Sequence, residues 1–291
     1  MYLRINKYIF NFNYKQLKTI RIYLFFWILI CSNISFLFSQ QISQTDSVIV
    51  VFGDTRSNPE VHRTVVNKIM LYKPLAVFHT GDLVFNGSKK SAWVTFEEIE
   101  APIIKNSRLY PCYGNHELHS KIMSRDFALP NNGKWYSVDI GNCHFVVIDN
   151  FSDYTKGSEQ YQWIENDLNN CPPGKFRMVI MHLPVYSSGP HNTQNKKIRK
   201  YLVPLFEKYK VSFVFSAHNH CYEKAYSHGI YYITTAGGGA PFYKKSKDIP
   251  ESQFFINTYH FCTLKNTGHT LHLEAIDTNL RVIDKIEVKQ P

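Results

Sequence analysis

Short segments of the chain are almost continuously apolar and are separated by polar loops. Runs of five or six residues rich in Val, Ile, Phe and Tyr are typical of strands that are buried on both faces of a sheet. The sequence predicts such strands at 47–52, 75–79, 108–113, 177–181 and 211–215. After residue 229 the pattern is strand-like throughout, with predicted strands at 230–235, 259–265, 270–277 and 281–288.

Apolar residues between the first five strands recur at helical spacing. Asn58 and Pro59 form a favourable cap and first turn for one helix, in which apolar residues then recur every four positions. Ser158 caps a second helix. A third apolar stripe covers residues 198–209, where Pro204 kinks or restarts the helix. Strands that alternate with helices and then give way to a strand-rich end predict an α/β fold.

The first forty residues differ from the rest of the chain. They carry five Lys or Arg and no Asp or Glu, and residues 22–38 form an apolar stretch that precedes a polar end. This order is that of a secretory signal, and a stretch of 17 residues that is interrupted by Cys31, Ser32, Asn33 and Ser35 is marginal for a membrane span. We expect residues 1–40 to be a signal peptide or an uncleaved membrane anchor, with a buried helix as a third alternative. Residues 41–291 then form one exported domain, periplasmic or secreted.

Composition narrows the class of protein. The 291 residues are 44% hydrophobic and 19% charged, which excludes intrinsic disorder, a collagen-like repeat and a long coiled coil. Residues 41–291 carry 28 Lys or Arg against 23 Asp or Glu, a mild excess that suits an anionic substrate. The basic runs at 89–90 and 196–200 are scattered, so we expect no nucleic-acid partner.

Five cysteines remain after residue 40, and none forms a CxxC pair. This excludes a zinc knuckle and argues against a full disulfide framework. We expect buried or free thiols, with one or two bridges as the alternative in an oxidising compartment.

Each of the five buried strands runs into a polar residue that is able to bind metal. These residues are Asp54, Asp82, Asn115, His182 and the pair His218 and His220. Taken alone, an Asp after Gly is more often a turn former and a lone His is more often structural. Loops at the carboxyl ends of strands converge on one crevice, however, so five separate segments could deliver ligands to one place. Two Asp, one Asn and three His suit Zn, Mn or Fe, and the joint pattern predicts a metal site.

The loops also carry five recognisable motifs. They are GDTR (53–56), GDLVFNG (81–87), GNHE (114–117), MH (181–182) and AHNH (217–220). In order and spacing the motifs resemble the five blocks of the calcineurin-like metallophosphoesterase superfamily, and the chain looks most similar to the purple acid phosphatase branch and its bacterial relatives. The resemblance implies a four-layer αββα sandwich of two mixed β-sheets with helices outside.

The resemblance also implies a centre of two metal ions, divalent or trivalent, chosen among Fe, Zn and Mn. Asp82 would bridge the two ions. Asp54 and His220 would complete the protein ligands of the first ion, and Asn115, His182 and His218 would bind the second. Two such cations can stabilise both the attacking and the leaving oxygens of a phosphoryl transfer.

Three further residues are candidates for contact with a substrate. His116 lies where the family places a phosphate-contacting or acid histidine, which could protonate the leaving alkoxide. His191 falls where related phosphatases carry another substrate-side histidine, with an exposed loop residue as the alternative. Arg56 could reach a substrate phosphate bidentately, with a surface or supporting salt bridge as the alternative. We assign His116 and His191 as catalytic, and these two with Arg56 as substrate-binding.

Two departures from the family pattern concern the first metal ion. Many members have a His where this chain has Arg56, and purple acid phosphatases have a Tyr where this chain has Phe85. Phe cannot bind the metal or give the charge transfer that colours those enzymes. We therefore predict a protein that is not purple, in which a divalent pair such as Zn or Mn is an equal alternative to Fe(III).

We expect an exported, acid phosphatase-like hydrolase of small phosphomonoesters. A phosphodiesterase or nucleotide pyrophosphatase on the same site is the alternative, because loops set the selectivity of such a fold. Another is a non-catalytic surface binding protein, although all six common ligands are present. Positively charged or donor groups beside the metals favour the monoester, whose phosphate carries more negative charge. A membrane is expected only through the N-terminal anchor, and no pattern indicates an oligomeric state.

Overall fold

The computed structural model describes residues 47–118, 120, 122–123 and 127–290, together with two short strands, β1 (Arg4–Ile5) and β2 (Tyr8–Ile9), which pair antiparallel. The chain divides into two units, residues 1–46 and 47–291. Apart from the two short strands, the predicted signal peptide or anchor lies outside the described residues. Within the described part of the chain, no helix is long and apolar enough to cross a membrane.

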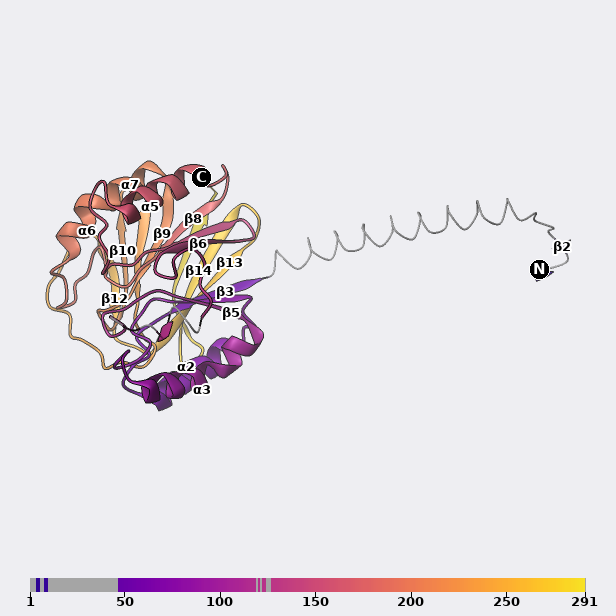
Figure 1. The fold of residues 1–291 in the computed structure, drawn as a ribbon, viewed down its shortest axis with the longest axis horizontal. Helices are drawn as coiled ribbons and strands as arrows, with labels where there is room; N and C mark the ends of the chain where they lie inside the picture. Colours follow the sequence, from indigo (N-terminus) through magenta and orange to yellow (C-terminus); the bar gives the residue numbers. More distant parts are fainter. Residues whose placement is uncertain are drawn as a thin grey trace. The chain divides into compact units, whose positions relative to one another are not determined.

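Two mixed sheets form the second unit (Figure 1). The six-stranded sheet contains β3 (Val48–Phe52), β4 (Ala76–His79), β5 (Arg108–Pro111), β13 (His260–Asn266), β14 (Thr270–Asp277) and β15 (Val282–Lys289). The seven-stranded sheet contains β6 (Tyr136–Ile140), β7 (Cys143–Val147), β8 (Phe176–Ile180), β9 (Val211–Ser216), β10 (Tyr222–Ser227), β11 (Ile230–Thr235) and β12 (Ser252–Ile256). Their strand orders are β15-β14-β13-β3-β4-β5 and β12-β10-β11-β9-β8-β7-β6. The strands β3, β4 and β5 are parallel in the six-stranded sheet, as are β7, β8, β9 and β11 in the seven-stranded sheet, so within each sheet their carboxyl ends share an edge.

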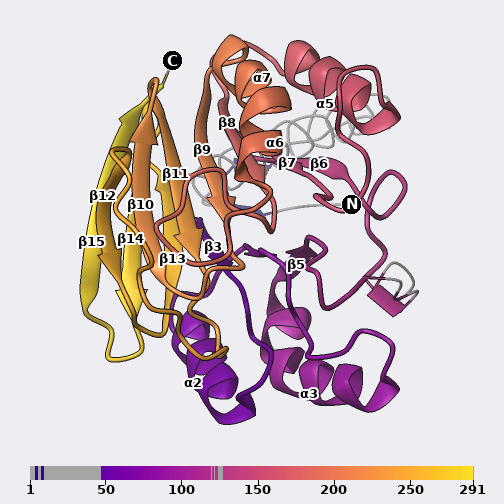
Figure 2. The ribbon, with the colours of Figure 1, turned by 90° about the vertical axis from the view of Figure 1, so that its left-hand side faces the viewer.

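Helices cover the outer faces of both sheets (Figure 2). On the six-stranded sheet lie α2 (Pro59–Met70) and α3 (Lys90–Asn106), and on the seven-stranded sheet lie α5 (Glu159–Asn170), α6 (Asn195–Tyr201) and α7 (Val203–Lys208). Side chains of β3 alternate between two apolar layers, as a strand requires. Ile49 and Val51 face the other sheet, whereas Val50 and Phe52 pack with residues of α2 and α3. A third apolar layer joins the seven-stranded sheet to its helices, which confirms the predicted four-layer sandwich.

The predicted helix starts are confirmed where a side chain caps the helix. Asn58 accepts a hydrogen bond from the backbone N–H of Val61, and Ser158 accepts one from Tyr161. The third apolar stripe forms two helices, and the second begins next to Pro204. The sequence analysis did not predict α3, which has no side-chain cap at Lys89 and contains Pro102. It also missed β6, β7, β10 and β12.

The five cysteines of this unit are all buried free thiols. The structure therefore supports the expectation of unpaired thiols, and no disulfide joins any of the described residues.

Candidate metal centre

The six predicted ligands lie in loops that follow strands of both sheets. Asp54, Asp82 and Asn115 follow β3, β4 and β5 of the six-stranded sheet, whereas His182 follows β8 and the pair His218 and His220 follows β9 of the seven-stranded sheet. The candidate centre therefore lies where the carboxyl edges of two sheets meet, and each sheet supplies three of the six side chains.

The ligand atoms form two overlapping groups. We call Asp54, Asp82 and His220 the first half-site, and Asp82, Asn115, His182 and His218 the second half-site. The ligand atoms of the first half-site lie within 4.8 Å of one another, as do those of Asp82, His182 and His218 in the second. Asp82 belongs to both groups, as a bridging ligand would.

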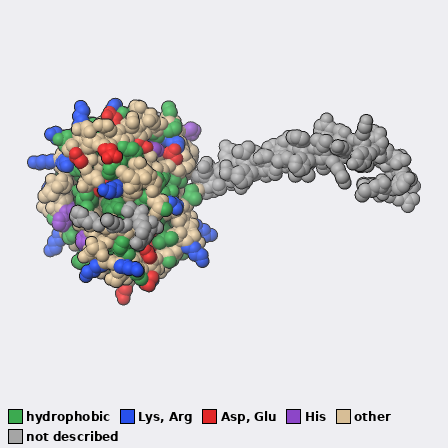
Figure 3. Space-filling view, viewed as in Figure 1, with side chains coloured by type: hydrophobic (Ala, Val, Ile, Leu, Met, Phe, Trp, Pro, Cys, Tyr) green, Lys and Arg blue, Asp and Glu red, His purple; other side chains and the backbone are tan. Residues whose placement is uncertain are grey.

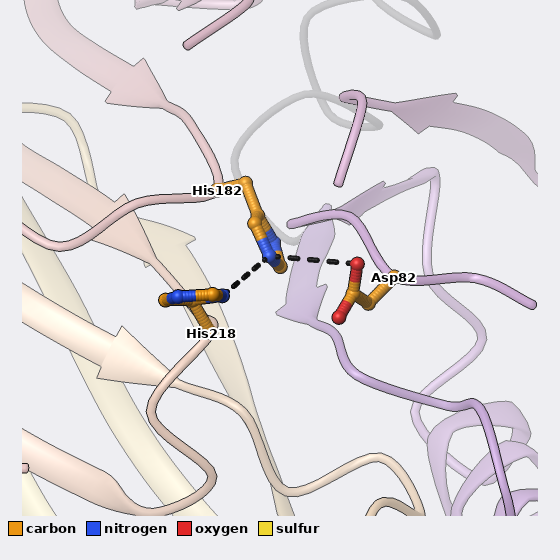
Figure 4. A group of neighbouring side chains, drawn as sticks. All are labelled: Asp82, His182 and His218. Atoms are coloured by element: carbon orange, nitrogen blue, oxygen red, sulfur yellow. Dashed lines mark hydrogen bonds and ion pairs between the residues drawn. The ribbon is translucent and has the colours of Figure 1, made fainter. Parts of the chain in front are cut away.

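In the second half-site, three ligand atoms lie around the Nε2 atom of His182. Figure 4 shows two of the residues that provide them, Asp82 and His218. Nε2 of His182 is 3.0 Å from Oδ1 of Asn115 and 3.2 Å from Nδ1 of His218. It is also 3.5 Å from Oδ1 of Asp82. Four oxygen and nitrogen atoms thus converge from four loops.

Hydrogen bonds on the far side of two rings fix which ring nitrogens face the centre. Nδ1 of His182 lies 2.9 Å from the carbonyl oxygen of Thr80, and Nδ1 of His220 lies 2.5 Å from that of Pro241. Because a carbonyl only accepts, each Nδ1 donates, and Nε2 is the ring nitrogen that is left to face the centre. Histidines that bind metal commonly have this arrangement.

Two further observations show that the residues fit a bound cation. Oδ1 of Asp54 is buried without a hydrogen-bond partner, although it lies 3.2 Å from Nε2 of His220. A buried carboxylate oxygen without a hydrogen-bond partner is unfavourable unless a cation compensates it. Burial, and then the neighbouring His182, lowers the pKa of His218 to about 3. Its ring is therefore neutral near pH 7, which is the form that binds metal.

Arg56 contacts the first half-site directly. Its Nε donates to Oδ2 of Asp82 at 3.1 Å, and its Nη2 lies 3.4 Å from Nε2 of His220. The structure thus shows a salt bridge, placed at the metal centre instead of at the surface, while the predicted contact with phosphate stays a prediction. Burial alone would raise the pKa of Asp82, but His182, His116 and Arg56 together lower it. A permanent positive charge therefore lies beside the first half-site.

The two predicted catalytic histidines both lie at the centre. Nδ1 of His116 donates to the carbonyl oxygen of Phe85 at 2.6 Å, and its Nε2 is 3.8 Å from Oδ2 of Asp82. The ring of His191 lies 5.2 Å from that of His218, centroid to centroid. Burial, followed by the charges of His220 and Arg56, lowers the pKa of His191. Their catalytic roles stay predictions.

Phe85 takes no part in the ligand set. Its side chain is 64% exposed, and its ring lies 5.5 Å from the ring of His116. The residue that stands in place of a tyrosine ligand thus supplies only a carbonyl oxygen and an apolar surface.

The backbone of three candidate ligands is strained. Asp54, Asp82 and His218 have φ angles of 56°, 56° and 68°, in the left-handed region that residues other than Gly seldom adopt. Such strain clusters at functional sites, where the surrounding structure maintains it. At Gly114, a Cβ atom would overlap the backbone N and the Oδ1 of Asp82, so only glycine allows these two loops to lie so close.

Three residues that the sequence analysis did not assign support the ligands. The buried carboxylate of Glu117 accepts backbone N–H groups of Asp82 and Gly114, both at 2.9 Å, and so joins two ligand loops. Burial, and then the charge of Asp82, raises the pKa of Glu117 to about 8. Its place in the GNHE motif was the only signal in the sequence.

The other two supporting residues are Asn219, which contacts His191, and Tyr243, which contacts His220. Asn219 bonds both the backbone N–H and the carbonyl of His191, at 3.0 and 2.9 Å. It thereby anchors a loop that the sequence left unconstrained. The ring of Tyr243 stacks on that of His220 at 4.2 Å, a contact that no motif indicated.

Known proteins are similar in sequence to much of the chain. The calcineurin-like phosphoesterase family matches residues 47–222, which is more than half of the chain. Purple acid phosphatase 21 of Arabidopsis thaliana is 28% identical over 185 residues, which cover 55% of this chain and 42% of that protein. Acid phosphatase type 7 of Mus musculus is 26% identical over 298 residues, which cover 84% of this chain and 67% of that protein. The chain thus spans less than half of the Arabidopsis relative. The family match confirms the resemblance that the motifs indicated.

Solved structures share the fold. Purple acid phosphatase PPD1 from seeds of yellow lupin (Lupinus luteus) superposes with a TM-score of 0.74 at 23% identity, covering 84% of this chain and 53% of that chain. GAP50, described as the anchor in the inner membrane complex of Plasmodium, superposes with a TM-score of 0.70 at 16% identity, covering 84% and 89%. At these identities the likeness concerns the fold alone.

Proposed function

Because the chain belongs to the calcineurin-like phosphoesterase family, we propose that it hydrolyses small phosphomonoesters at a centre of two metal ions. One observation carries the proposal: six ligand side chains from five loops converge. In two of them, His182 and His220, Nδ1 donates to a backbone carbonyl, so that Nε2 is directed at the other ligands. GAP50 shows that the fold alone does not decide between catalysis and anchoring. The retained ligand set favours catalysis.

Asp54, Asp82 and His220 would hold one ion, and Asp82, Asn115, His182 and His218 the other. When bound, the two ions polarise the phosphoryl group and make water more acidic. Arg56 adds positive charge beside the first half-site. Phe85 stands in place of the family's tyrosine, so this chain lacks the anionic phenolate that would favour a trivalent ion. We therefore propose a divalent pair, with Zn or Mn as the candidates.

His116 would act as the general acid. Its Nδ1 is committed to the carbonyl of Phe85, so Nε2 is the atom that would hold a proton and pass it to the leaving alkoxide. Nε2 faces Asp82 at 3.8 Å, which places it at the edge of the ligand set.

Arg56 and His191 would bind the extra negative charge of a monoester. Arg56 is only 12% exposed and is oriented by Asp82 and Ser57, while Asn219 holds His191 at its backbone. Positioned cationic and hydrogen-bonding groups favour a doubly charged phosphate over a singly charged diester. This difference supports a phosphatase over a phosphodiesterase or nucleotide pyrophosphatase.

We also propose export, which the basic start and the apolar stretch of residues 1–40 support. The mass of the N-terminal peptide of the exported protein tests whether this segment is cleaved or kept as an anchor.

The distribution of surface charge suits a small anionic substrate better than a nucleic acid. On the face drawn in Figure 3, Lys and Arg side chains are scattered and form no stripe.

The proposal is tested by hydrolysis of p-nitrophenyl phosphate and of its bis-ester by the purified full-length chain with added Mn, Zn or Fe. We expect faster turnover of the monoester, and loss of both turnover and bound metal in Asp82→Asn. The matched control is Asp248→Asn, because the side chain of Asp248 is 93% exposed and lies outside the centre. Preference for the bis-ester would favour the diesterase. Absence of metal-dependent turnover would favour a binding protein.

A further inference from the structure

A cavity of about 400 Å³ opens beside the first half-site. It lies between the first turn of α2, at Pro59 and His62, and the first half of α3, at Ala92 and Thr95. Both helices cover the six-stranded sheet (Figure 2). A volume of this size falls within the range of about 300–1,000 Å³ that small-molecule sites occupy.

The cavity borders the two loops that carry the candidate ligands Asp54 and Asp82. Thr55 and Arg56 line it and directly follow Asp54 along the chain, and Leu83 lines it and directly follows Asp82. The two loops are joined by a hydrogen bond of 2.9 Å from Oγ1 of Thr55 to the carbonyl of Leu83. A group attached to a phosphate at the centre could therefore extend into this space.

Most of the wall is apolar. Leu83, Val84, Phe96 and Ile99 are buried side chains of the apolar layer beneath the helices. None of the described residues that line the cavity is acidic, and its one permanent charge is that of Arg56. Such a lining favours the binding of an apolar group, whereas a polyol or a cation would lose its hydration there without gaining polar partners.

Phe85 also lines the cavity and adds an exposed apolar surface to it. It is a large apolar side chain that is 64% exposed, and its ring lies beside that of His116. Since His116 is the proposed acid for the leaving alkoxide, the leaving group would pass next to Phe85. An apolar leaving group would cover a ring that water otherwise contacts.

We propose that this cavity binds the apolar alkyl or aryl part of the leaving alcohol, so that the substrates are phosphomonoesters of apolar alcohols. The inference rests on the proposed function and adds the substrate class. In the reaction, water attacks phosphorus and the P–O bond to the alcohol breaks. The alcohol departs with a proton given by His116, and inorganic phosphate is the other product.

The first test measures binding without turnover. Dissociation constants of n-alkylphosphonates from ethyl to hexyl, whose C–P bond is not hydrolysed, are determined by calorimetry with the full-length chain and Mn²⁺. Each buried methylene should tighten binding by up to about fourfold, which corresponds to about 0.8 kcal/mol. The second test measures kcat/KM for the matching n-alkyl phosphates, whose leaving alcohols have nearly equal acidity, and should show the same slope.

A matched pair of variants locates the effect. Thr95→Trp places an indole in the cavity and should abolish the dependence on chain length. Val94→Trp adds the same side chain at the neighbouring position of α3, which does not line the cavity, and should keep the dependence. Both positions are exposed, and equal melting temperatures would show that both variants fold.

The outcomes separate the two proposals. A flat phosphonate series, or a slope that Thr95→Trp leaves intact, overturns the cavity assignment even if the monoesters are hydrolysed. If phosphonate affinity rises with chain length in the wild type but not in Thr95→Trp, and no ester is hydrolysed with metal, the cavity is confirmed as an apolar binding site and the proposed phosphatase function is refuted.

Discussion

Replacing Arg56 by Ala should strengthen metal binding at the first half-site. The guanidinium now contacts two of its three ligands, Asp82 and His220. An arginine keeps its proton at every accessible pH, so a metal ion must share these ligands with a fixed cation. In the second half-site, Arg56 contacts only the shared ligand Asp82, and the described contacts of Asn115, His182 and His218 involve no side chain of Lys or Arg.

The size of the effect follows from the contact that the metal must weaken. The bond from Nε of Arg56 to Oδ2 of Asp82 is 3.1 Å long and joins two charged groups. Hydrogen bonds to charged groups contribute about 1.5–3 kcal/mol. At 1.4 kcal/mol for each tenfold change, removal of this competition should tighten the first half-site about 10- to 150-fold.

Calorimetric titration of the metal-free full-length protein with Zn²⁺ or Mn²⁺ measures both half-sites. The wild type should show two affinities, and in Arg56→Ala the weaker one should approach the stronger. Arg63→Ala serves as the control, since Arg63 is an exposed cation of α2 outside the centre. Weaker binding in Arg56→Ala, or an equal gain in Arg63→Ala, would refute the reasoning.

Three other changes test supporting parts of the structure. Gly114→Ala should abolish metal binding measured by elemental analysis, because its Cβ would overlap Asp82; full metal content would contradict this. In Glu117→Gln the amide nitrogen cannot accept a hydrogen bond, so the backbone N–H groups of Asp82 and Gly114, or that of Val84, lose their acceptor. The change should cost about 1–3 kcal/mol in the free energy of unfolding measured with urea. His144 bonds two carboxylates, and although burial lowers its pKa, these bonds raise it overall. Its stabilising contribution should be full below about pH 6.5 and lost at higher pH, when the stability of the wild type is compared with His144→Gln; a difference that grows with pH would contradict it.

The sequence predicted the elements that simple patterns define. The continuous apolar runs of β3, β4 and β9 have the same composition as other strands buried on both faces. The helices α2 and α5 follow Asn58 and Ser158, whose side chains provide the caps. In contrast, α3 follows Lys89, whose side chain forms no cap, and its interior pattern alone did not predict a helix.

The ligand residues were predictable because each follows a strand in a short motif. The contacts that orient them were not, because they depend on tertiary structure. Nothing local links Arg56 to His220, which lies 164 residues away along the chain. The same holds for Tyr243, whose ring stacks on that of His220 although β10 and β11 separate the two residues along the chain.

The most direct measurement is anomalous X-ray diffraction at the Zn or Mn absorption edge from crystals of the protein prepared with that metal. The account predicts a fully occupied peak between Asp82, Asn115, His182 and His218. It predicts a second, less occupied peak between Asp54, Asp82 and His220, because Arg56 competes there. Absence of any peak among these side chains, or peaks only elsewhere, would contradict the metal centre on which the proposed function depends.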